Sequence, residues 1–236
     1  MRGPNVSEEL IAEALHPYPD HLVIATKGGF TRPGPGQWVP DGRPEHLREA
    51  CEGSLKRLRV DRIDLYQLHR PDPQVPYEES VGALKELQDE GKIRLVGVSN
   101  VSVEQLDIAR SLVSVASVQN GYNLAERAKR PGTFSTSIGY DSEEVLEACE
   151  GQGIAFIPYS PLAAGSLADS GGPVADLAQR YDATGAQIAL AWLLARSEVM
   201  LPIPGTTSVE HLEENLAAAG IELTDDEIAE LNEVAS

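Results

Sequence analysis

Polar side chains stand at or just beyond the ends of several apolar runs in this sequence. Lys27 follows the run LVIAT, and His69 follows the run IDLYQL. Lysine and histidine side chains can hold or move a proton, so this pair suits acid–base chemistry. In a parallel barrel all strands end on one face, and that face carries the active site. The pattern therefore predicts that Lys27 and His69 converge on a catalytic centre.

The same pattern recurs at the ends of four later apolar runs. The residues there are Ser99 and Asn100 after LVGV, Gln119 in VASVQN, Tyr159 and Ser160 after IAFIP, and Gly205 and Thr206 after LPIP. Amide and hydroxyl groups both donate and accept hydrogen bonds, which suits the binding of a polar ligand. Taken one at a time, these residues are better explained by capping of strand ends, and the tyrosine by core packing.

Apolar periodicity predicts the elements that position these residues. Strands are expected at about 22–26, 62–68, 93–98, 114–119, 154–159 and 200–204. Helices are expected over about 7–15, 44–58, 77–90, 103–111, 142–151, 174–182, 185–196, 208–218 and 224–236, with Ser7 as the first N-cap. This alternation implies a parallel sheet covered by helices.

Two α/β architectures fit such an alternation, a doubly wound sheet and an eight-stranded barrel. No GxGxxG or GxxxxGK[ST] loop occurs, which favours the (β/α)8 barrel. Only six strands are predicted, and strand number is tied to barrel closure. We therefore expect one domain over 1–236, a TIM-type barrel truncated at its N-terminus. The longest irregular stretches, 28–43 and 123–140, follow strands and are expected to be substrate loops, with Trp38 a candidate for the pocket wall.

Composition narrows the range of partners and locations. The formal net charge of -18 argues against nucleic acid and acidic lipid, which bind mainly through clustered Lys and Arg. No apolar run approaches the about 20 residues of a membrane span, and the first residues lack a signal-peptide core. A cytoplasmic protein is expected. Cys51 and Cys149 have no metal-like spacing and are expected to be reduced thiols near the core.

Several segments in order resemble the aldo-keto reductases. They are SEELIAEAL, IATKGGF, DLYQLHRPDP, VGVSN, VQNGYN, PYSPLAAG and PIPGTTSVEHLEEN, and together they run over essentially the whole chain. The resemblance implies a (β/α)8 barrel in which NADPH, with NADH as the alternative, gives a hydride to a small aldehyde or ketone. It also implies a catalytic tetrad of Asp, Tyr, Lys and His, of which Lys27 and His69 match two.

The resemblance places the tetrad Asp and Tyr on a DTAxxYG-like segment directly before GPNVSEEL. Met1 and Arg2 stand there in this chain, so the proton donor and its carboxylate are missing from the pattern. About the first two βα units would be lost with them. Burial of Lys27 without its carboxylate is expected to lower the pKa of the ammonium group.

The resemblance also assigns a cofactor site. It implies that Ser99, Asn100 and Gln119 bind the nicotinamide carboxamide and that the Tyr159 ring stacks on nicotinamide. Ser160 and Leu162 are implied to bind the pyrophosphate, and Glu214 and Asn215 to contact adenine. Thr206 precedes a helix whose N-terminal amides could bind a phosphate. Gly205 and His211 occupy positions at the ribose phosphate where members with strong NADPH preference often have Lys and Arg.

Two other interpretations stay open at the level of sequence. In the first, the chain is a catalytically silent module that binds nicotinamide nucleotide or a partner. In the second, it is a fragment that is not stably folded alone, and its open sheet edges promote self-association. The sequence specifies neither a particular carbonyl substrate nor an oligomeric state.

Overall fold

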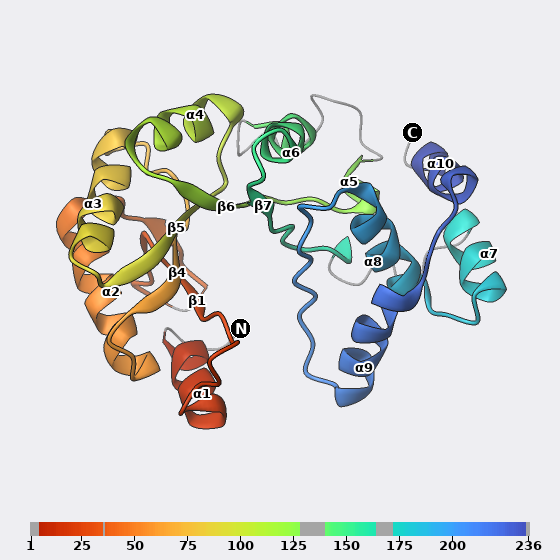
Figure 1. The fold of residues 1–236 in the computed structure, drawn as a ribbon, viewed down its shortest axis with the longest axis horizontal. Coiled ribbons are helices and arrows are strands. Elements are labelled where there is room, and N and C mark those ends of the chain that lie inside the picture. The colour runs from red at the N-terminus through yellow and green to blue at the C-terminus, as the bar shows by residue number, and fades with distance from the viewer. Residues whose placement is uncertain (1–4, 35, 128–139, 164–171, 235–236) are drawn as a thin grey trace. The chain divides into compact units, whose positions relative to one another are not determined.

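The computed structural model describes residues 5–34, 36–127, 140–163 and 172–234 (Figure 1). The chain forms two compact units, residues 1–118 and 119–236, which we describe separately. The prediction of a single domain stays a prediction.

The first unit is built on a sheet with the strand order β1-β4-β5-β6. These strands are β1 (Ala25–Gly28), β4 (Ile63–Leu68), β5 (Ile93–Ser99) and β6 (Val115–Gln119), the last ending at the first residue of the second unit. β1 and β5 each pair with β4 in parallel. Lys27 lies opposite Gln67, which in turn lies opposite Gly97. The predicted parallel α/β arrangement is confirmed for these strands.

Four amphipathic helices belong to this unit: α1 (Val6–Leu15), α2 (Pro44–Leu58), α3 (Tyr77–Asp89) and α4 (Val103–Leu112). Figure 1 shows α2, α3 and α4 along the outer side of the strands. Their inward residues, among them Leu47, Leu84 and Leu106, are fully buried. α1 begins after Asn5 rather than at Ser7, so the predicted N-cap was wrong; Asn5 adopts the left-handed conformation that asparagine tolerates.

A short hairpin occupies part of the stretch 28–43 that we expected to be irregular. Its strands, β2 (Phe30–Thr31) and β3 (Val39–Pro40), pair antiparallel. Strands of two residues carry too little periodicity to be recognised, and the prolines and glycines between them indicate only a loop. The hairpin places a segment of the predicted substrate loop directly after β1.

The second unit is mostly helical. Its elements are α5 (Leu124–Arg127), α6 (Ser142–Glu150), β7 (Ala155–Phe156), α7 (Pro173–Arg180), α8 (Gly185–Arg196), α9 (Val209–Ala217), a 3-10 turn η2 (Ala218–Gly220) and α10 (Asp225–Val234). α8 is its most buried helix, and Trp192 stacks on Tyr122 with ring centroids 5.9 Å apart. The Trp192 indole donates to Asn232 Oδ1 at 3.0 Å, which ties α10 to α8.

The sixth predicted strand, over 200–204, was wrong. In the described residues it is reduced to a single bridge between Phe156 and Met200, with Leu201 N–H donating to the Phe156 carbonyl at 2.8 Å. Pro202 and Pro204 have no N–H to continue such a ladder. The expected count of six strands is therefore not met in the part of the chain that the structure describes, whereas helix 185–196 is found with its predicted bounds.

Replacing the buried Leu84 of α3 by alanine tests this packing. Leu84 is 0% exposed and Leu112 of α4 is 36% exposed. We expect Leu84→Ala to reduce the free energy of unfolding by about 2–5 kcal/mol, because the deletion leaves a cavity. Leu112→Ala, the same change at a partly exposed position, should cost well under half as much. Urea unfolding of both variants measures the difference, and equal losses would contradict the assigned core.

Candidate active site

Two adjacent parallel strands bring Lys27 and His69 to one place. Lys27 lies in β1, and His69 directly follows β4. The His69 N–H donates to the Gly28 carbonyl at 2.8 Å, which continues the ladder between the two strands. Both side chains line a cavity of about 730 Å³ within the first unit. The predicted convergence of these two residues is thus seen in the geometry.

The environment of the cavity favours the uncharged forms of both side chains. Burial lowers the pKa of Lys27, because desolvation disfavours the charged ammonium form. Burial, together with the positive charges of Lys27, Arg32 and Arg70, lowers the pKa of His69 from 6.5 to about 4. His69 is therefore a neutral imidazole at pH 7, able to donate one hydrogen bond and accept another.

Aromatic side chains of the β2–β3 hairpin surround the histidine. The His69 ring lies edge-on to Phe30 at 4.7 Å and to Trp38 at 5.8 Å between ring centroids. The guanidinium carbon of Arg32 lies 3.3 Å from the centre of the Trp38 ring. Phe30, Arg32 and Trp38 all line the cavity, so the suggestion that Trp38 belongs to the pocket wall agrees with its position.

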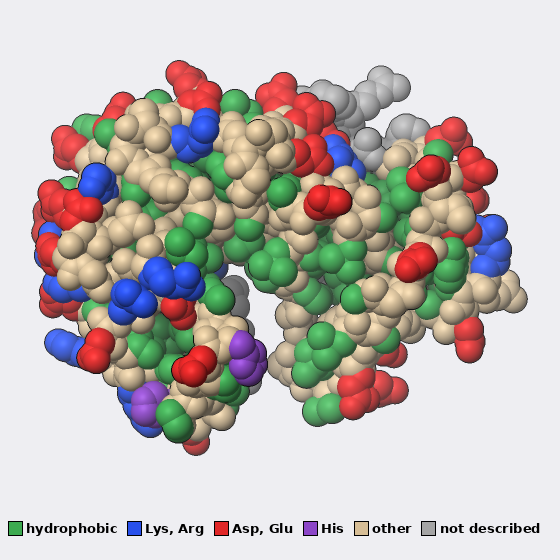
Figure 2. All heavy atoms as spheres, in the orientation of Figure 1, with side chains coloured by type: hydrophobic (Ala, Val, Ile, Leu, Met, Phe, Trp, Pro, Cys, Tyr) green, Lys and Arg blue, Asp and Glu red, His purple; other side chains and the backbone are tan. Residues whose placement is uncertain are grey.

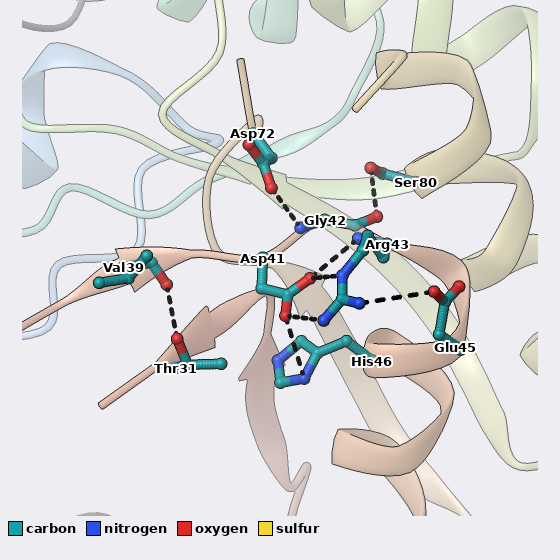
Figure 3. Close-up of polar contacts among 9 residues, drawn as sticks. All are labelled: Thr31, Val39, Asp41, Gly42, Arg43, Glu45, His46, Asp72 and Ser80. Atoms are coloured by element: carbon teal, nitrogen blue, oxygen red, sulfur yellow. Dashed lines mark hydrogen bonds and ion pairs between the residues drawn. The ribbon is translucent and has the colours of Figure 1, made fainter. Parts of the chain in front are cut away.

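A polar network fixes the chain that leaves the hairpin (Figure 3). Asp41 accepts two hydrogen bonds from the Arg43 guanidinium at 2.8 and 2.7 Å. Asp72, beyond the end of β4, accepts from the Gly42 N–H at 2.9 Å, and the Ser80 hydroxyl donates to the Gly42 carbonyl at 2.7 Å. The hairpin is thereby anchored to the same strand end that carries the histidine.

The end of β5 adds two of the predicted ligand-binding residues. Asn100 has a left-handed backbone conformation with φ 60°. Its Nδ2 donates to the His69 carbonyl at 2.9 Å and to the Ser99 hydroxyl at 3.1 Å. Ser99 and Asn100 therefore lie beside the histidine, and their side chains help to hold the backbone around it.

One polar layer inside the sheet was missed at the sequence level. Gln67 and Ser117 are buried, and Gln67 Nε2 donates to Ser117 Oγ at 3.1 Å. A Cβ at Gly97 would lie 2.4 Å from that hydroxyl, so only glycine fits between them. Gln67 is the residue opposite Lys27. A buried glutamine within an otherwise apolar run was the available signal.

In the second unit, Gln119 is buried and Tyr159 is partly exposed. The Tyr159 N–H donates to the Asn120 carbonyl at 3.0 Å, and its hydroxyl shares a hydrogen bond with the Tyr140 hydroxyl at 3.2 Å. The Tyr159 ring crosses Gly121 so closely that a Cβ there would lie 3.0 Å from the ring. A side chain at Gly121 would therefore displace the ring.

A second cavity, of about 660 Å³, lies within this unit. The predicted site residues that line it are Ser160, Leu162, Gly205, Thr206, His211, Glu214 and Asn215. Gln119 and Tyr159 are the residues predicted for this unit that are not part of that lining. Residues more than fifty positions apart in the sequence are thus gathered around one space.

The segment that leads into α9 contributes Thr206 and His211 to this cavity. The Ser208 hydroxyl caps the helix by accepting from the His211 N–H at 3.3 Å, and Thr206 Oγ1 accepts from the Ser208 N–H at 3.1 Å. Hydroxyls and backbone amides at a helix start are suited to a phosphate. Among the described lining residues there is neither lysine nor arginine.

The described residues contain no group of three or more His, Cys, Asp or Glu arranged to hold a metal ion. No helix in the described ranges is long and apolar enough to cross a membrane. Both cysteines are buried and free, and burial raises the pKa of the Cys51 thiol to about 11.

Fold and site together define a parallel α/β protein with proton-handling residues at its strand ends. A family model described as "Aldo/keto reductase family" matches residues 3–236, and the chain belongs to this family. The match covers nearly the whole chain, so it lends no support to an N-terminally truncated domain.

Related proteins agree with this assignment. An uncharacterized oxidoreductase of Schizosaccharomyces pombe is 48% identical over 98% of this chain and 71% of its own length. Pyridoxine 4-dehydrogenase of Escherichia coli is 36% identical over 98% of this chain and 78% of its own length. The crystal structure of an aldo-keto reductase from Klebsiella pneumoniae in complex with NADPH is 29% identical, with a TM-score of 0.78, covering 98% of this chain and 76% of that one.

The low pKa of His69 predicts a specific dependence of stability on pH. The unfolded chain protonates this histidine near pH 6.5, whereas the folded chain does so only near pH 4. The contribution of the neutral histidine is therefore present above pH 6.5 and is lost as pH falls from about 6.5 to about 4. We expect the free energy of unfolding to fall more steeply over this range in the wild type than in His69→Gln.

Chemical unfolding at several pH values measures this difference. His16→Gln, which removes an exposed histidine outside the cavity, controls for the loss of a histidine as such. Parallel curves for the wild type and His69→Gln would show that the histidine is not held neutral by the fold.

Proposed function

We propose that this protein reduces aldehydes or ketones to alcohols with NADPH as the hydride donor. The observation that carries the proposal is the presence of Lys27 and His69 on one cavity at the ends of adjacent parallel strands. When bound, the reduced nicotinamide supplies a hydride to the carbonyl carbon, and a proton added to the oxygen completes the alcohol. The NADPH complex of the Klebsiella pneumoniae relative supports this choice of cofactor.

The residues of the second unit fit the phosphate and adenosine parts of such a cofactor. We assign Ser160 and Leu162 to the pyrophosphate, and Thr206, with the amides that begin α9, to a phosphate. Gly205 and His211 would lie at the ribose, and Glu214 and Asn215 at adenine. The support is that all seven line one cavity, whose polar lining includes the hydroxyls of Ser160, Thr184 and Thr206 and the amide of Asn215. Since that lining has no lysine or arginine, NADH remains the alternative donor.

For the nicotinamide end we keep the roles that the family resemblance implies, and we support them within each unit separately. In the first unit, Ser99 and Asn100 are assigned to the carboxamide. In the second unit, Gln119 is assigned to the carboxamide and the Tyr159 ring to stacking. The supporting observations are that Ser99 and Asn100 lie beside His69, and that Gly121 leaves room for the Tyr159 ring. Amide and hydroxyl groups satisfy both the donor and the acceptor of a carboxamide.

Lys27 and His69 would act on the carbonyl oxygen. A neutral His69 can donate an N–H to that oxygen and so orient the carbonyl. The Lys27 ammonium, whose pKa burial lowers, stabilises negative charge that develops on the oxygen as the hydride arrives. Both interactions strengthen in the transition state, which is the condition for raising kcat.

Replacing either residue tests the proposal. We expect Lys27→Met and His69→Gln each to lower kcat/KM for aldehyde reduction by about 10²-fold or more, because each loses a group that acts on the reacting oxygen. The measurement is the loss of NADPH absorbance with a panel of aldehydes. Lys85→Met, at an exposed lysine paired with Asp89 on α3, is the matched control and should behave as wild type. Wild-type rates in both cavity variants would contradict the assignment.

A module that only binds a nucleotide would use the second cavity but would not need Lys27 and His69 on a shared cavity. The presence of this pair therefore favours an enzyme over such a module. The cytoplasmic location and the exclusion of nucleic acid and membrane partners stay predictions from the sequence, to be tested by fractionation and binding assays.

A further inference from the structure

A second tyrosine contacts the ring that we assign to nicotinamide stacking. The hydroxyl of Tyr140 lies 3.2 Å from the hydroxyl of Tyr159, and the two share a hydrogen bond. Both residues belong to the second unit, and both are partly exposed. Tyr140 ends the stretch 123–140 that we expected to be a substrate loop. Nothing in the sequence pattern pointed to Tyr140 itself, so this contact became visible only in the folded chain.

The elements of the second unit explain why these two residues meet. Tyr140 directly precedes Asp141, whose carboxylate caps α6 by accepting from the Glu143 N–H at 2.8 Å. The helix is packed down by residues that are fully buried, namely Val145, Leu146 and Cys149. β7 follows after a short turn, and Tyr159 comes just beyond that strand. A capped helix end and a strand end thus fix the backbone at two tyrosines that are nineteen positions apart.

The backbone of Tyr159 is fixed independently of Tyr140. The Tyr159 N–H donates to the Asn120 carbonyl at 3.0 Å, and Tyr159 forms a parallel bridge with Gly121. These contacts leave two side-chain torsions about which the ring can turn. The ring lies close over Gly121, where a Cβ would stand 3.0 Å from its Cζ atom, so this side limits its movement. The Tyr140 hydroxyl holds the tip of the ring and thereby sets its orientation.

The orientation of the Tyr159 ring matters because the charge of the chain does not favour an anionic cofactor. The net charge is -18, and Figure 2 shows acidic side chains over much of the visible face. The described lining of the second cavity holds no lysine or arginine to offset this charge locally. Contacts with the uncharged nicotinamide ring of NADPH must then supply more of the binding free energy. A stacking ring already held in its bound orientation loses less conformational entropy when the cofactor binds.

We propose that Tyr140 is a positioning residue whose hydroxyl holds the Tyr159 ring in the orientation that stacks on nicotinamide. Tyr140 acts through Tyr159, so its effect is confined to the nicotinamide half of the cofactor and does not reach the phosphate and adenosine half. Without the hydroxyl bond the ring samples other orientations, and binding must then select the productive one. This inference rests on the proposed function and adds to it a residue that the family resemblance did not assign.

Calorimetric titration of the whole chain with two ligands tests the proposal. NADPH carries the nicotinamide ring, whereas phospho-ADP-ribose lacks that ring and keeps the rest of the cofactor. We expect Tyr140→Phe to raise the Kd of NADPH by about three- to tenfold, as for the loss of one neutral hydrogen bond, and to leave the Kd of phospho-ADP-ribose unchanged. Tyr181→Phe is the matched control, because it removes a tyrosine hydroxyl of the same unit that donates to the Glu222 carbonyl at 3.0 Å. It should bind both ligands as the wild type does.

The reciprocal change and the double variant separate positioning from a general structural effect. Tyr159→Phe should raise the Kd of NADPH to a similar extent, and the double variant should bind no more weakly than either single variant, because both changes remove the same bond. An unchanged Kd of NADPH in Tyr140→Phe, equal weakening of both ligands, or additive losses in the double variant would overturn the inference while leaving carbonyl reduction intact. A loss in Tyr140→Phe that is specific to NADPH, with no reduction of any aldehyde by the wild type, would instead refute the proposed function and support the positioning role.

Discussion

The parallel pairing of β1 with β4 is the constraint on which the candidate active site depends. It sets Lys27 opposite Gln67 and brings the His69 backbone onto the Gly28 carbonyl, so two residues forty-two positions apart reach one cavity. A shift of one residue would turn the Lys27 side chain to the other face of the sheet. Asn100, which directly follows β5, donates from its Nδ2 to the His69 carbonyl. Three neighbouring strands, β1, β4 and β5, therefore determine where the histidine lies.

The β2–β3 hairpin determines the environment of the His69 ring. Because its aromatic residues and Arg32 cover the histidine, the imidazole stays neutral, and the cavity gains both a flat apolar wall and positive charge. The polar network around Asp41 and Asp72 holds the hairpin to the strand end. The hairpin and the His69 ring that it covers are thus held at the same strand end.

The strand and helix alternation was predictable because several helices show a buried stripe in the sequence, as in the segment 44–58, where Leu47, Cys51, Ser54 and Leu58 are buried. The apolar character of 200–204 predicted a strand, but Pro202 and Pro204 have no N–H groups to pair with a neighbouring strand. The β2–β3 hairpin was missed because strands of two residues are too short to show an alternating pattern. Lys27 and His69 could be found because each ends an apolar run, and their family role came from resemblance. The contributions of Arg32 and Phe30 could not, because they depend on how a loop folds back over a strand end.

The most direct test of the central claim is a double-mutant cycle on kcat/KM for NADPH-dependent aldehyde reduction with Lys27→Met, His69→Gln and the double variant. If the two side chains act on one carbonyl oxygen, their effects should be non-additive, with a coupling of about 1 kcal/mol or more. Strictly additive losses would show that Lys27 and His69 work independently and would contradict a shared catalytic cavity.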